Sequence, residues 1–155
     1  MSTTLVRKMD VKRGWHLMDA TDRSLGRMAV AIARVLMGKH KVDFTHNADC
    51  GDYVIVVNAG KIRVDAHSKW KTKEYQTYSH YPGGQRRVAF KDMLARRPER
   101  VIELAVKRML PKNRIADRMM TRIKIYKTAE HPHGNHRPVV LEINSITGGR
   151  AVSPV

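Results

Sequence analysis

The sequence predicts an α/β fold, and three successive segments carry this prediction. Residues 15–18 (Trp-His-Leu-Met) form a short apolar-alternating segment, which is typical of a strand. Apolar residues then recur at helical spacing from Leu25 to Leu36. Residues 53–57 (Tyr-Val-Ile-Val-Val) are an unbroken, largely β-branched run, typical of a parallel strand that is covered on both faces. A strand, a helix and a second buried strand in this order predict a βαβ unit with a right-handed crossover.

The elements around this unit follow from capping residues and shorter patterns. Residues 19–24 are rich in helix-capping side chains, and Gly38 stands where a left-handed residue ends a helix. Helical patterns resume at Phe90 and again from Pro98, whose apolar stripe continues for three turns. Alternating or apolar runs predict three further short strands, at residues 62–64, 123–126 and 139–143.

Residues 66–87 have no clear periodicity, and we expect a long loop there. We expect at least one of its aromatic side chains to fix the loop to the core. Residues 144–155 contain Gly, Ser and Pro and predict a flexible C-terminal extension. Residues 1–13 lack the apolar segment of a secretory signal and suggest a short basic arm. We therefore expect one α/β domain over residues 1–143, followed by the extension.

The net charge is the feature that bears most directly on function. Thirty Lys and Arg oppose fourteen Asp and Glu, which leaves a formal charge of +16. Hydrophobic residues make up 42% of the chain and alternate with the cations, so the charge belongs to a folded body. Four cationic groups stand out, at residues 39–41, 69–87, 96–100 and 112–127. One such group alone is usually a solvated surface, but four together favour a nucleic-acid partner.

Motifs of common enzyme classes are absent from the sequence. It contains no GxGxxG, GxxxxGK[ST] or GxSxG pattern. No apolar run reaches the length of a membrane span. We therefore expect no enzymatic activity, no cofactor, no small-molecule substrate and no membrane association.

A metal site is also not expected. Cys50 is the only cysteine, which rules out an intrachain disulfide and a cysteine-based zinc site and fits a reducing, cytosolic setting. His131, His133 and His136 lie close in sequence, but Pro132 and Gly134 among them favour a polar turn. A second cluster is acidic, and turn or strand-start roles suit it better than metal binding; its members are Asp43, Asp49 and Asp52.

A series of short motifs resembles the bacterial-type large-subunit ribosomal protein thirteen family. Each motif is weak alone, but together they cover residues 15–143 in the family's order. The densest match runs from Arg96 to Glu103 and from Met109 to Asn113. The others are Trp15 with Asp19-Ala20, Leu25-Gly26-Arg27, Gly38-Lys39-His40-Lys41, Gly51-Asp52-Tyr53-Val54, Asn58-Ala59, Tyr81-Pro82-Gly83-Gly84, Lys124-Ile125-Tyr126 and Glu130-His131-Pro132-His133.

This resemblance implies a three-layer α/β/α domain with a mostly parallel four-stranded sheet. It implies binding to large-subunit ribosomal RNA, a role in early subunit assembly and translation, neighbouring large-subunit ribosomal proteins as further partners, and a cytoplasmic location in the ribosome. The RNA-facing residues that it implies are Lys39, His40, Lys41, Gly83, Gly84, Arg96, Arg97, Arg100, Lys112, Asn113 and Arg114.

Charge and aromatic character add further candidates for RNA binding. Lysine and arginine neutralise phosphates, and exposed aromatic rings stack on unpaired bases. Gly83 and Gly84 allow close backbone approach to a phosphate or only a tight turn. The added candidates are Arg27, Lys69, Lys71, Tyr78, Tyr81, Arg86, Arg87, Lys107, Arg108, Arg118, Arg122 and Lys124.

Two other functions compete with a structural role on RNA. An RNA- or nucleotide-processing enzyme would need convergent catalytic groups, for which the histidine and aspartate clusters are the only candidates. A general DNA-compacting protein would bind any duplex with comparable affinity.

Overall fold

The computed structural model describes residues 10–65 and 67–141, without the side chains of residues 67–69. Most of the expected N-terminal arm and the expected extension 144–155 lie outside these residues. The chain alternates between strands and helices in the order β1 (Trp15–Asp19), α1 (Leu25–Met37), β2 (Tyr53–Val57), η1 (Ala59–Lys61), α2 (His67–Thr72), β3 (Glu74–Tyr78), β4 (Gln85–Ala89), α3 (Phe90–Arg96), α4 (Pro98–Met109), α5 (Arg114–Met120), β5 (Ile123–Ile125), η2 (Gly134–His136) and β6 (Val139–Val140).

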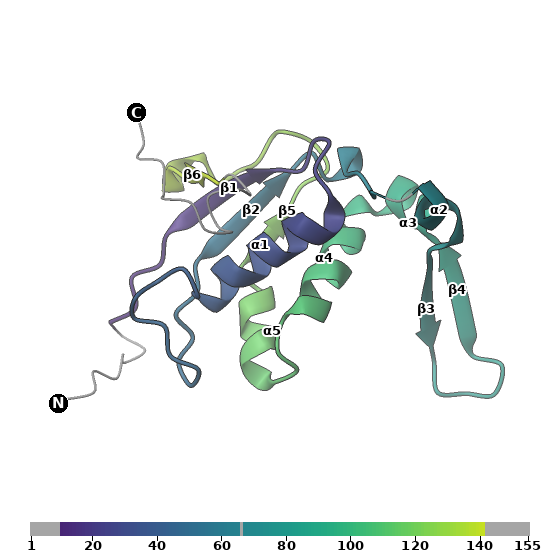
Figure 1. Cartoon of the computed structure of the whole chain (residues 1–155), viewed down its shortest axis with the longest axis horizontal. Helices are drawn as coiled ribbons and strands as arrows, with labels where there is room; N and C mark the ends of the chain where they lie inside the picture. The colour runs from purple at the N-terminus through teal and green to yellow at the C-terminus, as the bar shows by residue number, and fades with distance from the viewer. Residues whose placement is uncertain (1–9, 66, 142–155) are drawn as a thin grey trace.

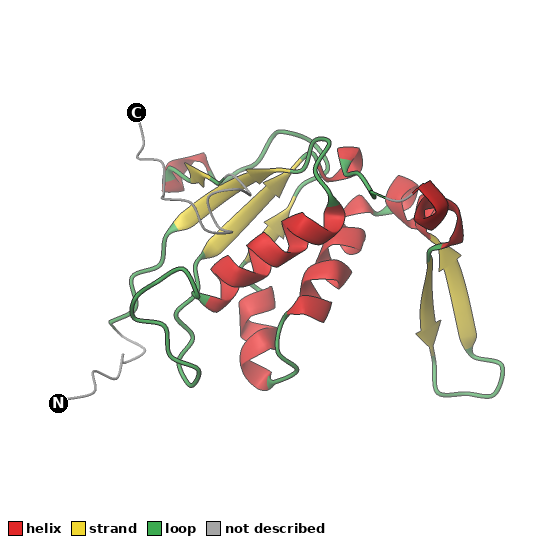
Figure 2. Ribbon diagram, in the orientation of Figure 1, coloured by secondary structure: helices red, strands yellow, loops and turns green. Residues whose placement is uncertain are grey.

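A four-stranded parallel sheet forms the centre of the molecule, which confirms the predicted α/β class (Figure 2). The strand order is β5-β2-β1-β6. β1 and β2 run in register from the pair Trp15–Tyr53 to the pair Asp19–Val57. Because all strands point the same way, Trp15 and Tyr53 mark one edge of the sheet, the amino edge, and Asp19 and Val57 mark the opposite carboxyl edge.

The core lies between this sheet and the helices α1, α4 and α5, which share one face of it (Figure 1). Met28, Ile32 and Leu36 of α1 are fully buried, as their helical spacing predicts. Gly38 has φ of 79° and ends α1, and the N–H of Lys39 donates to the carbonyl of Arg34 at 3.0 Å. This left-handed C-cap is the one predicted from the sequence.

The prediction for residues 66–87 was wrong, since this segment folds into α2 and a β3–β4 hairpin (Figure 1). The hairpin projects from the body, so both faces of its outer half meet solvent, and its strands lack the apolar alternation that identifies a strand in sequence. Tyr75 is buried beside Phe90, and Trp70 packs edge-on against Phe90 with ring centres 5.2 Å apart. The expectation that an aromatic residue fixes this segment to the core is therefore confirmed.

Of the predicted strands, one is absent from the structure and another is shorter than expected. Residues 62–64 form no strand, because only Arg63 makes a bridge, in parallel with Ser24. β6 pairs with β1 through Val139 and Val140 alone. Among the described residues, no helix has the length and apolar character needed to cross a membrane.

Candidate nucleic-acid interface

The predicted RNA-binding residues are mostly exposed, and the structure gathers many of them on two surfaces. The hairpin surface consists of Tyr78, Tyr81, Gly83, Gly84, Arg86 and Arg87. The second surface, the α4–α5 corner, consists of Lys107, Arg108, Lys112, Asn113, Arg114 and Arg118.

Other predicted residues lie apart from these two surfaces. Arg96, Arg97 and Arg100 are exposed where α3 meets α4, and Lys39 is exposed after α1. Lys71 is exposed on α2, while the side chain of Lys69 is not described; Lys124 on β5 is half-buried, and Arg27 is exposed in the first turn of α1.

At the hairpin tip, a tight turn presents two aromatic rings to solvent. Tyr78 is 58% exposed and Tyr81 is 73% exposed. The N–H of Gly84 donates to the carbonyl of Tyr81 at 2.9 Å, and Gly83 has φ of 70°. A Cβ on Gly84 would lie 2.1 Å from the Ser79 hydroxyl oxygen. The turn itself therefore requires both glycines, and it holds the tyrosines next to the cations of β4.

At the α4–α5 corner, cations follow one another around a sharp change of chain direction. Lys107 and Arg108 occupy the last turn of α4, where positive charge also complements the helix dipole. The Oδ1 atom of Asn113 accepts a hydrogen bond from the N–H of Ala116 at 2.9 Å and caps α5. The Asn113 side chain therefore shapes the corner, while the exposed Lys112 and Arg114 beside it supply its charge.

Arg122 departs from the sequence prediction, because its guanidinium is buried. Its side chain is only 5% exposed and donates to both oxygens of Asp49, at 2.6 and 2.5 Å. A third bond reaches the carbonyl of Leu36 at the end of α1, at 3.2 Å. Arg122 thus ties the residues before β5 to the 38–52 segment, and we remove it from the RNA-binding set.

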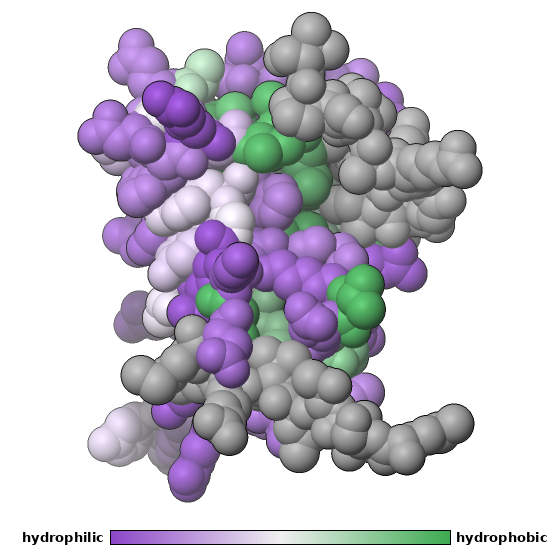
Figure 3. Space-filling model, turned by 90° about the vertical axis from the view of Figure 1, so that its left-hand side faces the viewer, coloured by the Kyte–Doolittle hydropathy of each residue, from purple (hydrophilic) through white to green (hydrophobic). Residues whose placement is uncertain are grey.

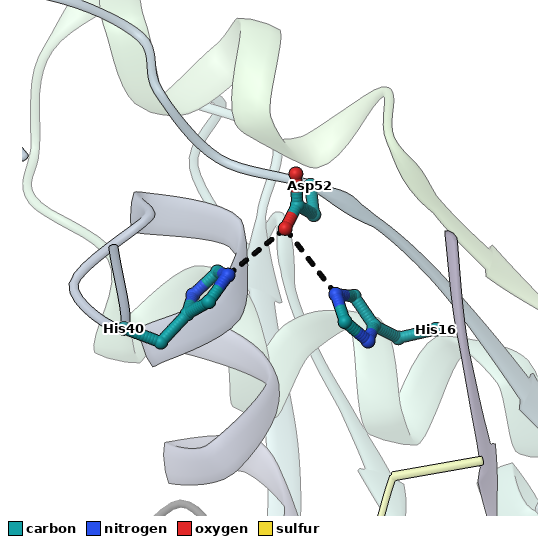
Figure 4. A group of neighbouring side chains, drawn as sticks. All are labelled: His16, His40 and Asp52. Atoms are coloured by element: carbon teal, nitrogen blue, oxygen red, sulfur yellow. Dashed lines mark hydrogen bonds and ion pairs between the residues drawn. The ribbon is translucent and has the colours of Figure 1, made fainter. Parts of the chain in front are cut away.

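His40 and Lys41 share an internal partner, the carboxylate of Asp52. Figure 4 shows His40 and His16 pointing toward this carboxylate. One carboxylate oxygen of Asp52 lies 2.9 Å from Nε2 of His40 and 3.2 Å from Nε2 of His16. The other accepts bonds from Lys41 at 2.5 Å and from the N–H of Gly14 at 2.8 Å. This cluster fixes the residues after α1 to the amino edge of the sheet.

The partners of Asp52 also decide its charge. Burial alone would raise the pKa of this carboxyl, but hydrogen bonds from His16, His40, Lys41 and Gly14 outweigh burial and hold the pKa far below its usual range. Asp52 is therefore ionised throughout the physiological range. Its charge is balanced inside the protein and not by an external ligand.

His16, His40 and Asp52 form the one group in the described chain that brings three potential metal ligands together, within 4.8 Å of one another. Two features favour an anchoring role for this group. The ammonium of Lys41 already occupies the same carboxylate. A histidine that binds metal through Nε2 usually donates its other N–H to an acceptor, whereas the buried Nδ1 of His16 has no partner within residues 10–65 and 67–141.

The histidines at 131–136 are used for packing against aromatic rings. His136 stacks on Trp15 with ring centres 4.1 Å apart, and Trp15 stacks on Tyr53 at 4.3 Å. His133 Nε2 lies 2.8 Å from the Tyr126 hydroxyl oxygen. Burial first, and then the charges of neighbouring histidines and Lys124, lower the pKa of His133, which favours its neutral form.

No pattern in the sequence indicates the internal roles of Asp49 and Asp52. Asp49 pairs with a residue 73 positions away and Asp52 with one 36 positions away, so neither pairing has a local spacing pattern. Asp52 directly precedes β2, in agreement with the predicted strand-start role, and the long-range pairs of Asp49 and Asp52 are an additional role that was not predicted. Cys50 is a buried, free cysteine.

Comparison with known proteins bears on the whole chain. Residues 13–132 match the family model described as ribosomal protein L13. A relative from Aquifex aeolicus, named large ribosomal subunit protein uL13, is 48% identical over 145 residues, which cover 94% of this chain and 100% of the relative.

Two further relatives carry the same name. The protein from Symbiobacterium thermophilum is 48% identical over 91% of this chain and 98% of its own length. The protein from Hahella chejuensis is 45% identical over 92% of this chain and 100% of its own length. With its α/β fold and a family match over most of its length, the chain belongs to the ribosomal protein L13 family.

Proposed function

We propose that this protein is a structural component of the large ribosomal subunit, that it binds large-subunit ribosomal RNA and supports early subunit assembly, and that it has no catalytic role. The observation that carries the proposal is the accumulation of exposed cations on the hairpin surface and the α4–α5 corner of a protein with a formal charge of +16. The names of its relatives support the ribosome as the setting.

The two surfaces suit different parts of a folded RNA. The α4–α5 corner carries point charges on rigid helix ends, which suits the phosphates of A-form helices, whose base edges are largely hidden. The hairpin surface adds Tyr78 and Tyr81, whose exposed rings can stack on unpaired bases. The protein then acts as a bridge that reduces repulsion between RNA segments, with neighbouring ribosomal proteins as its other partners and the cytoplasm as its location.

Salt dependence of RNA binding tests this proposal. If six or more phosphates are neutralised, affinity for large-subunit RNA falls about a thousandfold between about 50 and 200 mM salt. The measurement is filter binding of the full chain to transcribed large-subunit RNA, with an unrelated duplex DNA of equal length as control. A flat salt profile contradicts the proposal, and equal affinity for the duplex indicates general DNA compaction instead.

The enzymatic alternative has a separate test. His133 and His136 pack on Trp15 and Tyr126, so truncating both removes packing and leaves RNA affinity within a few-fold of wild type under the structural role. Loss of a turnover reaction on RNA in the truncated protein, with the fold intact by circular dichroism, would contradict a structural role.

A further inference from the structure

A pocket lies at the amino edge of the sheet, away from the hairpin surface and next to Tyr53. Its volume is about 410 Å³. Figure 3 shows the side of the molecule at the left of Figure 1, where hydrophilic residues make up most of the coloured surface and hydrophobic areas lie among them. We call it the Tyr53 pocket; it is lined by Arg13, Asn47, Ala48, Asp49, Tyr53, Ile115, Arg118, Thr121 and Arg122.

One wall of the Tyr53 pocket is an aromatic ring that is already held in place. Trp15 stacks on Tyr53 with an angle of 9° between the rings, and His136 stacks on Trp15 with an angle of 5°. A ring fixed in this way loses little conformational entropy when a further flat group packs beside it. Ile115 adds an apolar contact on the α5 side of the pocket.

The charge of the pocket favours an anion. Arg122 neutralises Asp49, the one acidic residue of the lining, through two hydrogen bonds, and its buried Nε atom has no partner among the residues that the structure describes. Arg13 donates a long bond, at 3.5 Å, to the Asp49 carbonyl and lies 3.8 Å from the Asp49 carboxylate, which Arg122 holds more closely. Arg118 is exposed on α5. The lining thus carries three arginines against one carboxylate, and this excess of positive charge favours an incoming phosphate.

We propose that the Tyr53 pocket receives one unpaired nucleotide of the bound RNA, with its base beside Tyr53 and its phosphate between Arg13 and Arg118. The pocket volume lies in the range of small-ligand sites, which is enough for a single nucleotide. Asn47 offers both a donor and an acceptor to the edge of the base. The inference rests on the proposed RNA binding, and it adds a defined site for a nucleotide outside the duplex regions.

Zero-length ultraviolet crosslinking of the full chain on large-subunit RNA tests the site. We expect a nucleotide adduct on the peptide that contains Tyr53, and primer extension should place it at one unpaired position. Arg118→Glu should lower the yield of this adduct about tenfold, the loss that follows from one charge-assisted phosphate contact. Lys91→Glu is the matched control, because Lys91 is exposed on α3, outside the pocket, and changes the net charge equally.

The outcomes separate this inference from the proposed function. RNA binding with no Tyr53 adduct, with adducts spread over paired positions, or with equal yields in Arg118→Glu and Lys91→Glu overturns the nucleotide site and leaves RNA binding intact. Failure of the wild-type chain to bind the RNA in a filter assay overturns both. Circular dichroism confirms that each variant is folded; the exposure of Arg118 and Lys91 favours this.

Discussion

Replacing Arg122 with alanine separates a structural from an RNA-binding role for this cation. The side chain is 5% exposed, and all of its hydrogen bonds among the described residues stay inside the protein, to Asp49 and to the Leu36 carbonyl. Arg122→Ala leaves the Asp49 carboxylate, which is only 16% exposed, without its main counter-charge. We expect the variant to lose stability, with RNA affinity unchanged once it is folded.

The size of this loss follows from the burial of the pair. Removing one partner of a buried ion pair costs about 3–5 kcal/mol, and the partial exposure of Asp49 favours the lower value of about 3 kcal/mol. With a urea m-value of about 2 kcal/mol per M, the unfolding midpoint should fall by about 1.5 M. A domain of ordinary stability, about 5–15 kcal/mol, remains folded after such a loss.

Urea unfolding followed by circular dichroism measures the change, and RNA filter binding in the absence of urea measures the affinity. Arg118→Ala is the control on the neighbouring exposed surface and should shift stability by less than about 0.5 kcal/mol. The double variant Asp49→Ala/Arg122→Ala should be less destabilised than the sum of its single changes, since no charge is left unpaired. An unchanged midpoint together with weaker RNA binding by Arg122→Ala would refute the reasoning.

Two further predictions concern the 38–52 segment and its neighbours. Because the folded-state pKa of Asp52 lies below its unfolded value near 4, its stabilising contribution is present above about pH 4 and is lost as the pH falls further. Asp52→Asn should therefore cost about 3 kcal/mol at pH 7, with a smaller difference near pH 3; urea unfolding at both pH values checks this, and a pH-independent difference contradicts it. A Cβ on Gly51 would lie 1.7 Å from the Leu36 carbonyl oxygen, so Gly51→Ala should cost about 2 kcal/mol or more in a thermal melt. At Gly60 a Cβ meets nothing within 4 Å, so Gly60→Ala should change stability little. Equal losses of stability in the two variants would contradict the close contact of Gly51 with the Leu36 carbonyl.

The central fold could be predicted from the sequence because its signals are local. The 3.6-residue spacing in α1 and the apolar run of β2 are visible within one window, and Gly38 ends α1 in the predicted way. The hairpin could not be predicted from such a window. Its strands pair with each other while most of their side chains meet solvent, so no apolar alternation marks them.

The sequence shows which residues are cationic but not which of them are exposed, so the RNA-binding residues could be predicted only where a cation is also exposed. A count of cations treats Arg118 and Arg122 alike. The Arg118 side chain is exposed, whereas Arg122, four positions later, is buried in an ion pair. The difference is decided by Asp49, which lies far away in sequence and approaches Arg122 only when β5 joins β2. Likewise, Asn113 lies in a basic stretch, but its side-chain oxygen accepts a hydrogen bond from Ala116 and caps α5.

The distribution of acidic residues gives the molecule a polarity that composition alone conceals. Parallel α/β sheets commonly bind ligands beyond the carboxyl ends of their strands. Here that edge carries Asp19, Asp22 and Asp65, and its exposed Arg63 already pairs with two of them, at 3.3 and 3.6 Å. At the amino edge, by contrast, Asp49 and Asp52 are neutralised by internal partners. Both edges carry cations, since Lys61 lies near Asp19 and Arg27 near Asp65. The carboxylates of Asp22 and Asp65 remain exposed, whereas those of Asp49 and Asp52 are largely buried in internal pairs. This difference favours the amino edge, which holds the Tyr53 pocket, for contact with a polyanion.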